Sequence, residues 1–375
     1  MIGGGPGAFI GAVHRIAAAL DGQIDLVCGA FSQTPEKSKE MSECLYLNPK
    51  RVYGSFQEMI ENEKQLPLGE KMDFVSIVTP NHMHYLPAKL ALENGFSVIC
   101  DKPVTLNSKE AEELAELASR KKLTFALTHN YTGYPMVKEA RSLVRKGELG
   151  KIRKIVVEYP QGWLSSPLEK SGQKQAGWRT NPKEAGISCC MGDIGSHAEN
   201  LCEYITGLKI TSLCADLTTF IDGRLLDDDG NVLLRFNNGA RGVLYASQVS
   251  AGEENNLSIR VYGEKGGIEW HQMEPNTLLY KKADGHTQII RTGVGQLSEE
   301  AKLHTRLPPG HPEGYLEAFA NLYRNFAAVL QAKENGLKID ERLDFPTIQD
   351  GIRGMKFIEA VVKSSQTDNK WTALN

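Results

Sequence analysis

Phe74-Val75-Ser76-Ile77-Val78 and Ser97-Val98-Ile99-Cys100 are two short apolar runs, separated by a helical pattern that ends on Gly95. Short apolar runs followed by Thr79-Pro80 and by Asp101-Lys102-Pro103 are typical of buried strands that end at a turn. Glycine accepts the left-handed backbone conformation that closes a helix. A strand, a helix and a second strand in this order predict a parallel sheet with a right-handed crossover.

The same alternation extends over the first third of the chain. Further candidate strands are Asp25 to Ala30 and Thr124 to Thr128, and candidate helices begin near Ile10, Pro35, Ser55, Pro87 and Ser108. Ser55-Phe56-Gln57-Glu58 has the form of a capping box. The pattern predicts a doubly wound α/β domain of the Rossmann type, which binds a dinucleotide, over residues 1–130.

Long candidate strands follow one another after about residue 150. They are Ile152 to Tyr159, Ile210 to Thr219, Val232 to Phe236, Gly242 to Val249, Leu257 to Tyr262 and Gly267 to His271. Asn238-Gly239 between two of them predicts a hairpin, because both residues tolerate positive φ. Helical patterns return at about Gly314 to Asn335 and Thr347 to Ser364. Residues 131–375 are therefore predicted to form an α+β domain with a mostly antiparallel sheet, open on one face, for substrate binding and oligomerisation.

Composition excludes several classes of protein. The 375 residues carry a net charge of -3 with 41% hydrophobic residues, so a nucleic-acid partner is not expected, and no apolar run is long enough for a membrane helix. Seven cysteines without a repeating spacing indicate reduced thiols in a cytoplasm. Cys189-Cys190 is expected to be buried or to line a pocket. Asp227-Asp228-Asp229-Gly230 lacks the later glutamate of a calcium loop and is expected to be a solvated acidic turn.

A glycine-rich loop opens the chain. Glycines let a turn adopt unusual φ angles and let the backbone approach a pyrophosphate, which the next helix N-terminus can bind. Only Met1 and Ile2 precede the loop, so either the natural protein is expected to be longer at its N-terminus or the numbering begins inside the first strand. The loop residues predicted to contact the cofactor are Gly3, Gly5, Pro6, Gly7, Ala8, Phe9 and Ile10.

The stretch after the second candidate strand, Gly29 to Pro35, contains no acid for the adenosine ribose. Ser32 can bind a ribose hydroxyl or a 2′-phosphate and Lys37 can add charge, so these residues leave the choice between NAD and NADP open. Further cofactor contacts are expected where parallel strands end, since ligands bind at that edge of an open α/β sheet. They are Thr79, Pro80, Asn81, His84, Asp101, Lys102 and Asn130.

Three polar side chains are candidates for chemistry. Lys102 follows a strand, where such a side chain is often only solvated, and Asp193 and His197 are spaced to share one helix face, as in a surface ion pair. The unperturbed pKa of histidine, near ~6.5, suits His197 to act as the general base when a secondary alcohol loses a hydride. Lys102 can stabilise the alkoxide that develops in this reaction, and Asp193 can orient the lysine and the histidine. No metal is required for this chemistry.

Together these residues resemble the Gfo/Idh/MocA family of oxidoreductases over nearly the whole chain. The likeness includes the glycine loop, Thr79-Pro80-Asn81 with His84, Gly192-Asp193 with His197, and Asp101-Lys102-Pro103 where the family often has Glu-Lys-Pro. The resemblance implies that Lys102, Asp193 and His197 are the catalytic triad. Trp178-Arg179-Thr180 and Gly310 to Tyr315 look most like levoglucosan dehydrogenases and related sugar or glycoside dehydrogenases, which oxidise a pyranose hydroxyl, typically at carbon 3, to a ketone using NAD.

Aromatic faces and hydrogen-bond donors suit a polyhydroxylated ring. The predicted substrate contacts are Lys102, Tyr131, Tyr134, Trp163, Trp178, Arg179, Asp193, His197 and His311. Three alternatives stay open: a dehydrogenase of inositol or another cyclic polyol, a glycosidase that uses NAD for transient oxidation, and a nucleotide-sensing protein without catalysis. The open sheet face predicts a homodimer or homotetramer, since pairing with a second copy buries apolar surface.

Overall fold

The computed structural model describes residues 1–374, which divide into two units. The first unit comprises Met1–Thr128 and Phe319–Ile352, and the second comprises His129–Ala318 and the chain from Arg353 onward. The first boundary lies close to the predicted one at residue 130. The second unit is not continuous, however, because residues 319–352 return to the first unit.

The sheet of the first unit is parallel, in the order β1-β2-β3-β4. Isolated parallel bridges of Ile2 with Ala30 and of Gly29 with Val52 extend it beyond β1, which gives the strand order of a dinucleotide-binding fold. The expected strand over 25–30 is reduced to this bridged pair, so that prediction is wrong for most of its length. The strands are β1 Ile2–Gly3, β2 Phe74–Val78, β3 Ser97–Cys100 and β4 Phe125–Leu127.

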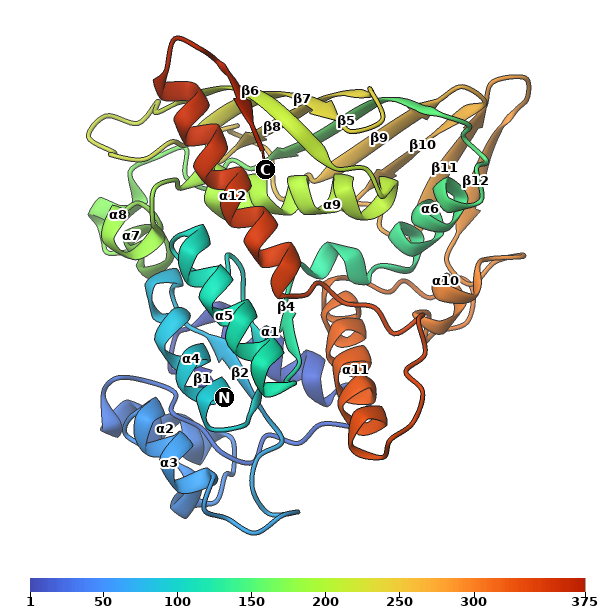
Figure 1. Ribbon diagram of the computed structural model, residues 1–375. Coiled ribbons are helices and arrows are strands. Elements are labelled where there is room, and N and C mark those ends of the chain that lie inside the picture. The colour runs from blue at the N-terminus through green and yellow to red at the C-terminus, as the bar shows by residue number, and fades with distance from the viewer. Residues whose placement is uncertain (375) are drawn as a thin grey trace. The chain divides into compact units, whose positions relative to one another are not determined.

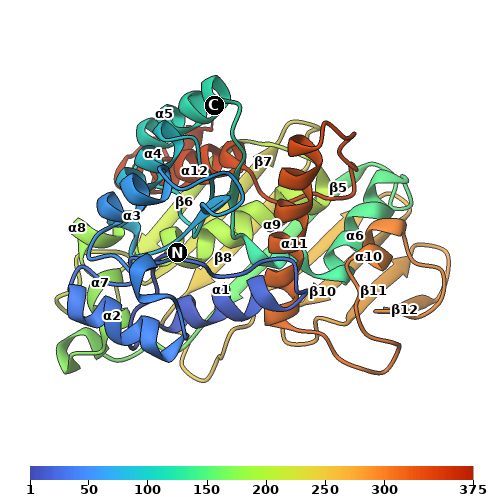
Figure 2. The same ribbon diagram turned by 90° about the horizontal axis from the view of Figure 1, so that it is seen from below.

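Helices cover both faces of this sheet. α4 and α5 lie side by side on one face (Figure 1). α1 and residues 319–334 of α11 adjoin one another on the other side (Figure 2), where His14 of α1 contacts Phe319 and Tyr323. The helices are α1 Phe9–Ala19, α2 Pro35–Cys44, α3 Phe56–Glu63, α4 Tyr85–Glu93, α5 Ser108–Lys121 and α11 Tyr315–Glu334.

Local signals determined several helix ends. The Ser55 side chain accepts a hydrogen bond from the Glu58 N–H at the start of α3, as the predicted capping box requires. Gly95 follows α4 with φ +87°. Helix α5 ends at Lys121, and Lys122 takes a left-handed φ of +58°.

The second unit contains a nine-stranded, mostly antiparallel sheet in the order β12-β11-β10-β9-β5-β8-β7-β6-β13. The six predicted strands are confirmed within a few residues, and β11, β12 and β13 were not predicted. The strands are β5 Ile152–Pro160, β6 Ile210–Thr218, β7 Asp229–Phe236, β8 Arg241–Ser247, β9 Ser258–Gly263, β10 Gly266–His271, β11 Thr277–Lys282, β12 Thr287–Arg291 and β13 Trp371–Ala373.

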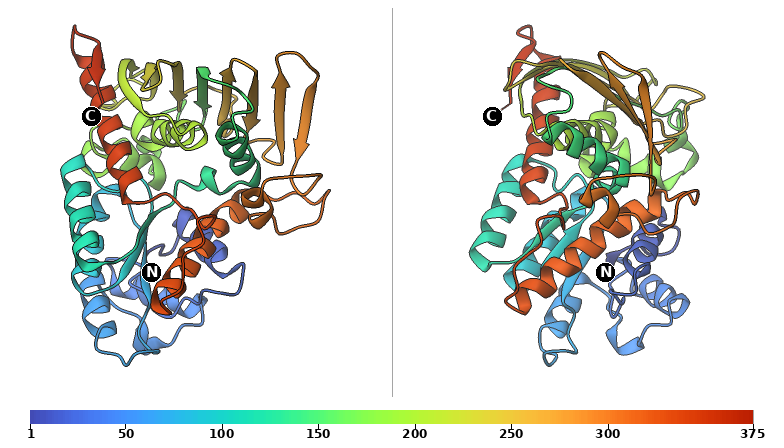
Figure 3. Two further views of the ribbon diagram at one scale, coloured as in Figure 1. Left: turned by 45° about the vertical axis from the view of Figure 1, so that its right-hand side comes forward. Right: turned by 90° about the vertical axis from the view of Figure 1, so that its right-hand side faces the viewer.

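Helices of this unit lie on one face of the large sheet, where α6 and α9 run beneath the strands (Figure 3). In β7, Val232 and Leu234 face the helices and are buried, while Leu233 between them is 49% exposed. The fold class is therefore the predicted one. The helices are α6 Pro135–Arg145, α7 Lys174–Arg179, α8 Pro182–Ala185, α9 Ser196–Thr206, α10 Glu299–Leu303 and α12 Ile348–Gln366, the last from Arg353 onward.

The predicted hairpin joins β7 to β8. Only Gly239 adopts a positive φ, of +90°, while the Asn238 side chain accepts a hydrogen bond from the Ala240 N–H. In the part of the chain that the structure describes, no helix is long and apolar enough to cross a membrane.

Candidate functional site

The glycine-rich loop between β1 and α1 needs its glycines for space. Gly3 has φ +85°, and a Cβ atom on Gly5 would lie 2.7 Å from the carbonyl oxygen of Phe31. A Cβ atom on Gly11, in α1, would lie 2.4 Å from the Gly4 Cα, so this glycine lets the helix pack on the loop. Ala8, the N-cap residue of α1, supplies no side-chain hydrogen bond. The amides of the first turn can therefore bind an anion, and the loop fits a dinucleotide pyrophosphate.

The stretch expected to contact the adenosine ribose, Gly29 to Pro35, has no carboxylate. The Ser32 hydroxyl accepts a hydrogen bond from the Thr34 N–H at 3.1 Å and closes a turn directly after the bridged pair. Lys37 is exposed on α2. Both residues keep their predicted roles as candidate contacts of the adenosine ribose.

His84 is buried between two loops. Its Nδ1 lies 2.7 Å from the carbonyl oxygen of Pro103 and its Nε2 lies 2.8 Å from that of Thr79. Burial lowers the pKa of this imidazole. His84 thus ties the loop after β2 to the loop after β3, and its contact with a cofactor stays a prediction.

Lys102 follows β3 on a backbone that its neighbour holds. The Asp101 carboxylate accepts hydrogen bonds from the Lys102 N–H at 2.9 Å and from the Thr128 hydroxyl at 2.8 Å, both through Oδ1. This arrangement connects the ends of β3 and β4 at the position of the proposed catalytic lysine. Asp101 therefore holds the backbone of Lys102, and its contact with a cofactor stays a prediction.

Asp193 and His197 lie on one continuous helical segment in the second unit. The segment includes a π turn, Met191–Gly195, that runs into α9. Both residues are therefore helical, but the helix at Asp193 is wider than an α-helix, and their sharing one face stays a prediction. Such π turns are frequent at functional sites.

The Asp193 carboxylate has two strong donors from other elements. Its Oδ2 accepts from the Arg179 Nε at 3.0 Å and from the Gln248 Nε2 at 2.9 Å. The Arg179 guanidinium lies 4.1 Å from the centre of the Trp178 ring and 5.8 Å from that of Trp163. Arg179 thus pairs with Asp193 and stacks on half-buried tryptophans, although the sequence predicted it as a substrate contact.

Aromatic rings surround the His197 imidazole. The ring centres of Tyr131, His129 and Tyr159 lie 4.8, 5.3 and 6.3 Å from it. Burial raises the pKa of both tyrosine hydroxyls, so they stay protonated and can donate. The His197 imidazole therefore packs against a wall of three buried aromatic rings, those of His129, Tyr131 and Tyr159.

A hydrogen-bonded chain leads from this wall to Trp163. The Tyr131 and Tyr159 hydroxyls bond each other, and Tyr159 donates to the Asn255 Oδ1 at 2.8 Å. Gln161 donates to the same oxygen at 2.6 Å, and the Trp163 Nε1–H donates to the Gln161 Oε1 at 3.0 Å. Amide and hydroxyl groups next to half-buried aromatic rings are suited to a ring that carries several hydroxyls.

Two predicted substrate residues lie elsewhere in the second unit. Tyr134 is 1% exposed and packs between Tyr131 and Trp270, with ring centres at 6.3 and 5.4 Å. It lies in the core beside Tyr131, and its contact with substrate stays a prediction. His311 is exposed in a loop, where its Nδ1 lies 3.2 Å from the Pro308 carbonyl oxygen. Its predicted contact with substrate stays a prediction, as does that of buried Asn130 with the cofactor.

Tyr159, Gln248 and Asn255 were not predicted from the sequence. Tyr159 lies in the last two residues of β5 and Gln248 directly follows β8. Their place at strand ends was the signal in the sequence that could have indicated them. Asn255 is in an irregular loop and gave none. Among residues 1–374, no group of three or more His, Cys, Asp and Glu side chains is arranged to hold a metal ion.

Two ranges of this chain match described protein families. Residues 1–129 match the family described as "Oxidoreductase family, NAD-binding Rossmann fold", and residues 137–269 match "GFO/IDH/MocA C-terminal domain". These two ranges correspond to the glycine loop with Lys102 and to the segment with Asp193 and His197.

Similar proteins include one curated relative of almost equal length. The chain is 33% identical over 375 residues, 99% of this chain and 95% of the other, to "Uncharacterized oxidoreductase YfiI" of Bacillus subtilis (strain 168). It is 28% identical over 217 residues, 52% of this chain and 54% of the other, to levoglucosan dehydrogenase of Pseudarthrobacter phenanthrenivorans. The solved structure of an inositol dehydrogenase homolog from Azotobacter vinelandii, complexed with NADH and myo-inositol, is similar with a TM-score of 0.91 and 33% identity, covering 100% of this chain and 96% of that one.

Proposed function

Because this chain belongs to the Gfo/Idh/MocA family of NAD-binding oxidoreductases, we propose that it oxidises a ring hydroxyl of a sugar, anhydrosugar or glycoside to a ketone, at carbon 3. The observation that carries this proposal is the placement of Asp193 and His197 on one helical segment, among aromatic, amide and hydroxyl groups. The similarity to levoglucosan dehydrogenase supports the substrate class.

The proposed reaction divides among three side chains. His197 accepts the hydroxyl proton, and Lys102 donates a hydrogen bond to the same oxygen as its negative charge develops. Asp193, held by Arg179 and Gln248, keeps a negative charge that stabilises the protonated imidazole. The glycine loop would hold NAD, which when bound would supply the acceptor for the hydride of the carbinol carbon. The products are a ketone, NADH and one proton.

A cyclic polyol is the second candidate substrate. The structure of the inositol dehydrogenase homolog is 33% identical to this chain, whereas that of levoglucosan dehydrogenase with NADH and levoglucosan is 22% identical, and both comparisons cover 100% of this chain. Inositol offers the same secondary hydroxyls on a ring, and the same three side chains can oxidise it. The chemistry is unchanged between the two candidates.

A panel of substrates tests the proposal. Levoglucosan, glucose, a methyl glycoside and myo-inositol are each incubated with NAD and with NADP, and absorbance of the reduced nicotinamide is followed. We expect NADH to accumulate with at least one sugar, anhydrosugar or glycoside. NADH with inositol alone would favour the polyol alternative, release of sugar without net NADH would indicate a glycosidase, and no turnover with any compound would contradict the proposal.

The exposed face of the large sheet supports a proposed homodimer or homotetramer. It presents Leu233, 49% exposed, and Tyr262, 37% exposed, beside the ion pair of Arg260 with Glu158. We expect sedimentation equilibrium to give a dimer or tetramer, and Leu233→Glu to shift it toward monomer because a charge would then be buried at the contact. Leu68→Glu, at an 84% exposed site in the first unit, is the control. A monomeric wild type would contradict the assembly.

A cytoplasmic location is also proposed. All seven cysteines are free thiols, and five of them are buried. Cys189 and Cys190 are among the buried ones, as the sequence indicated, at 3% and 0% exposure. Free thiols are kept in reducing compartments.

A further inference from the structure

The helical segment that carries Asp193 and His197 begins with amide groups that cannot bond within the helix. It starts at Cys190, and the first hydrogen bond inside it runs from the Asp193 N–H to the Cys189 carbonyl oxygen at 2.8 Å. The first N–H groups of any helix need acceptors from outside, and unpaired buried amides are costly. The acceptors of the four N–H groups from Cys189 to Gly192 therefore decide how this segment is held.

All four of these amides end at Asp227 or Ser188. The Asp227 carboxylate accepts from the Cys189 N–H at 3.0 Å and from the Met191 N–H at 2.9 Å, and its backbone carbonyl accepts from the Cys190 N–H at 3.0 Å. The Ser188 hydroxyl accepts from the Gly192 N–H at 3.0 Å and donates to the Asp227 Oδ2 at 3.0 Å. Asp227, 36 to 38 residues later in the chain than the amides it bonds, thus accepts three of the four hydrogen bonds of the helix cap.

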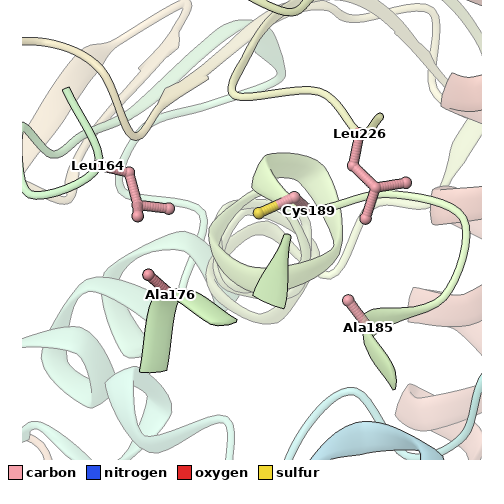
Figure 4. Packing of buried hydrophobic residues seen from close by; sticks show 5 residues of the cluster. All are labelled: Leu164, Ala176, Ala185, Cys189 and Leu226. Atoms are coloured by element: carbon pink, nitrogen blue, oxygen red, sulfur yellow. The ribbon is translucent and has the colours of Figure 1, made fainter. Parts of the chain in front are cut away.

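The cap is enclosed by apolar side chains. Asp227 is 7% exposed and Ser188 is 2% exposed. Leu226, which precedes Asp227, belongs to a cluster around Cys189 with Leu164, Ala176 and Ala185 (Figure 4). The sequence predicted a solvated acidic turn here, and that prediction is wrong. Burial raises the pKa of the Asp227 carboxyl, while its three hydrogen bonds favour the ionised form.

We propose that Asp227 is a positioning residue of the active site, fixing from the loop before β7 the helix start that carries Asp193 and His197. The inference rests on the proposed function of those two residues. Met191, whose N–H bonds the Asp227 carboxylate, stands two positions before Asp193, so a displaced cap shifts the catalytic carboxylate directly. A negative charge at a helix N-terminus is also favourable to the helix dipole.

Asp228 provides a matched control in the neighbouring position. It is 0% exposed, and its carboxylate accepts from the Phe220 N–H at 2.8 Å, the Ile221 N–H at 3.1 Å and the Arg224 guanidinium at 3.2 Å. Asp228 therefore holds a different loop and makes none of the cap hydrogen bonds. Removing either carboxylate disturbs a buried hydrogen-bond network, but only Asp227 bonds the helix start.

The test compares Asp227→Asn with Asp228→Asn in the full chain with NAD. An asparagine at 227 places its amide N–H groups against the donor of either Met191 or Cys189, so only one of these two hydrogen bonds can re-form. We expect kcat to fall by about 10- to 100-fold in Asp227→Asn, with the Kd of NAD unchanged, because small displacements of a catalytic group have effects of that size. Asp228→Asn is expected to lower Tm to a similar extent and to keep kcat within threefold of the wild type.

Amide hydrogen exchange supplies a readout that needs no substrate. Exchange at residues 189–192 is expected to accelerate in Asp227→Asn and to stay slow in Asp228→Asn. If Asp227→Asn does not fold, Ser188→Ala removes the acceptor of the Gly192 N–H and is expected to show the same changes at smaller size.

Equal losses of kcat in Asp227→Asn and Asp228→Asn, an unchanged kcat in Asp227→Asn, or unchanged exchange at 189–192 would each overturn the inference. A wild type without any polyol oxidation would instead remove the proposed function, and the exchange experiment would still decide the role of the cap.

Discussion

Lys102→Met is expected to lower kcat by about 10³-fold while the Kd of NAD changes little. Methionine keeps the length and the apolar stem of lysine but cannot donate a hydrogen bond to the alkoxide. The main-chain N–H of residue 102 still bonds the Asp101 carboxylate, so the local backbone is preserved. The measurement is steady-state oxidation of the best substrate, together with NAD binding followed by fluorescence.

Lys109→Met is the control for this variant. Lys109 is exposed on α5, a few residues after Lys102, and its loss is expected to leave both kcat and NAD affinity unchanged. Near-normal kcat in Lys102→Met would remove the lysine from the mechanism. A loss of NAD binding that accounts for the whole effect would make Lys102 a cofactor ligand only.

Acid is expected to destabilise the first unit through His14. This imidazole is fully buried on α1, and its Nδ1 lies 2.7 Å from the Tyr323 hydroxyl, which also bonds Ser76. Burial lowers the pKa of His14 to about 4, although Asp101 opposes the shift and His84 and Arg15 add to it. The unfolded chain binds a proton near pH ~6.5 and the folded chain binds it only near pH 4. Stability is therefore present above pH ~6.5 and is lost as the pH falls toward 4.

The expected loss attributable to His14 is about 3 kcal/mol of unfolding free energy between pH 7 and pH 4. His14→Asn keeps a polar atom near Tyr323 and cannot take up this proton. Urea unfolding at the two pH values is expected to show a pH dependence smaller by about that amount in the variant than in the wild type. An equal pH dependence in the two proteins would show that the pKa of His14 is the same in the folded and the unfolded chain, and would contradict the prediction.

Much of the fold could be predicted because its signals are local. The strands 74–78 and 97–100 have the predicted bounds, and α5 begins at Ser108 as predicted. The bridged pair Gly29 and Ala30 could not be predicted in this way. Its pairing depends on where β1 and Val52 lie, and not on the apolar run that precedes it.

The environment of the site depended on contacts between distant segments. Residue types and spacing indicated Asp193 and His197. The start of their helical segment is capped by Asp227, whose carboxylate accepts hydrogen bonds from the amides of Cys189 and Met191, and no local pattern in the sequence indicates this contact. Arg179 had the features of a substrate contact until its position beside Asp193 was known. Tyr134 likewise reads as a pocket residue in sequence and is enclosed by Tyr131 and Trp270 in the fold.

A crystal structure with NADH and the best substrate of the panel tests the account most directly. It is predicted to show the Lys102 ammonium and the His197 imidazole both at hydrogen-bonding distance, about 3 Å, from one ring oxygen whose carbon faces the nicotinamide. A complex in which either group is directed away from that oxygen, with full activity in solution, would contradict the proposed roles of Lys102 and His197.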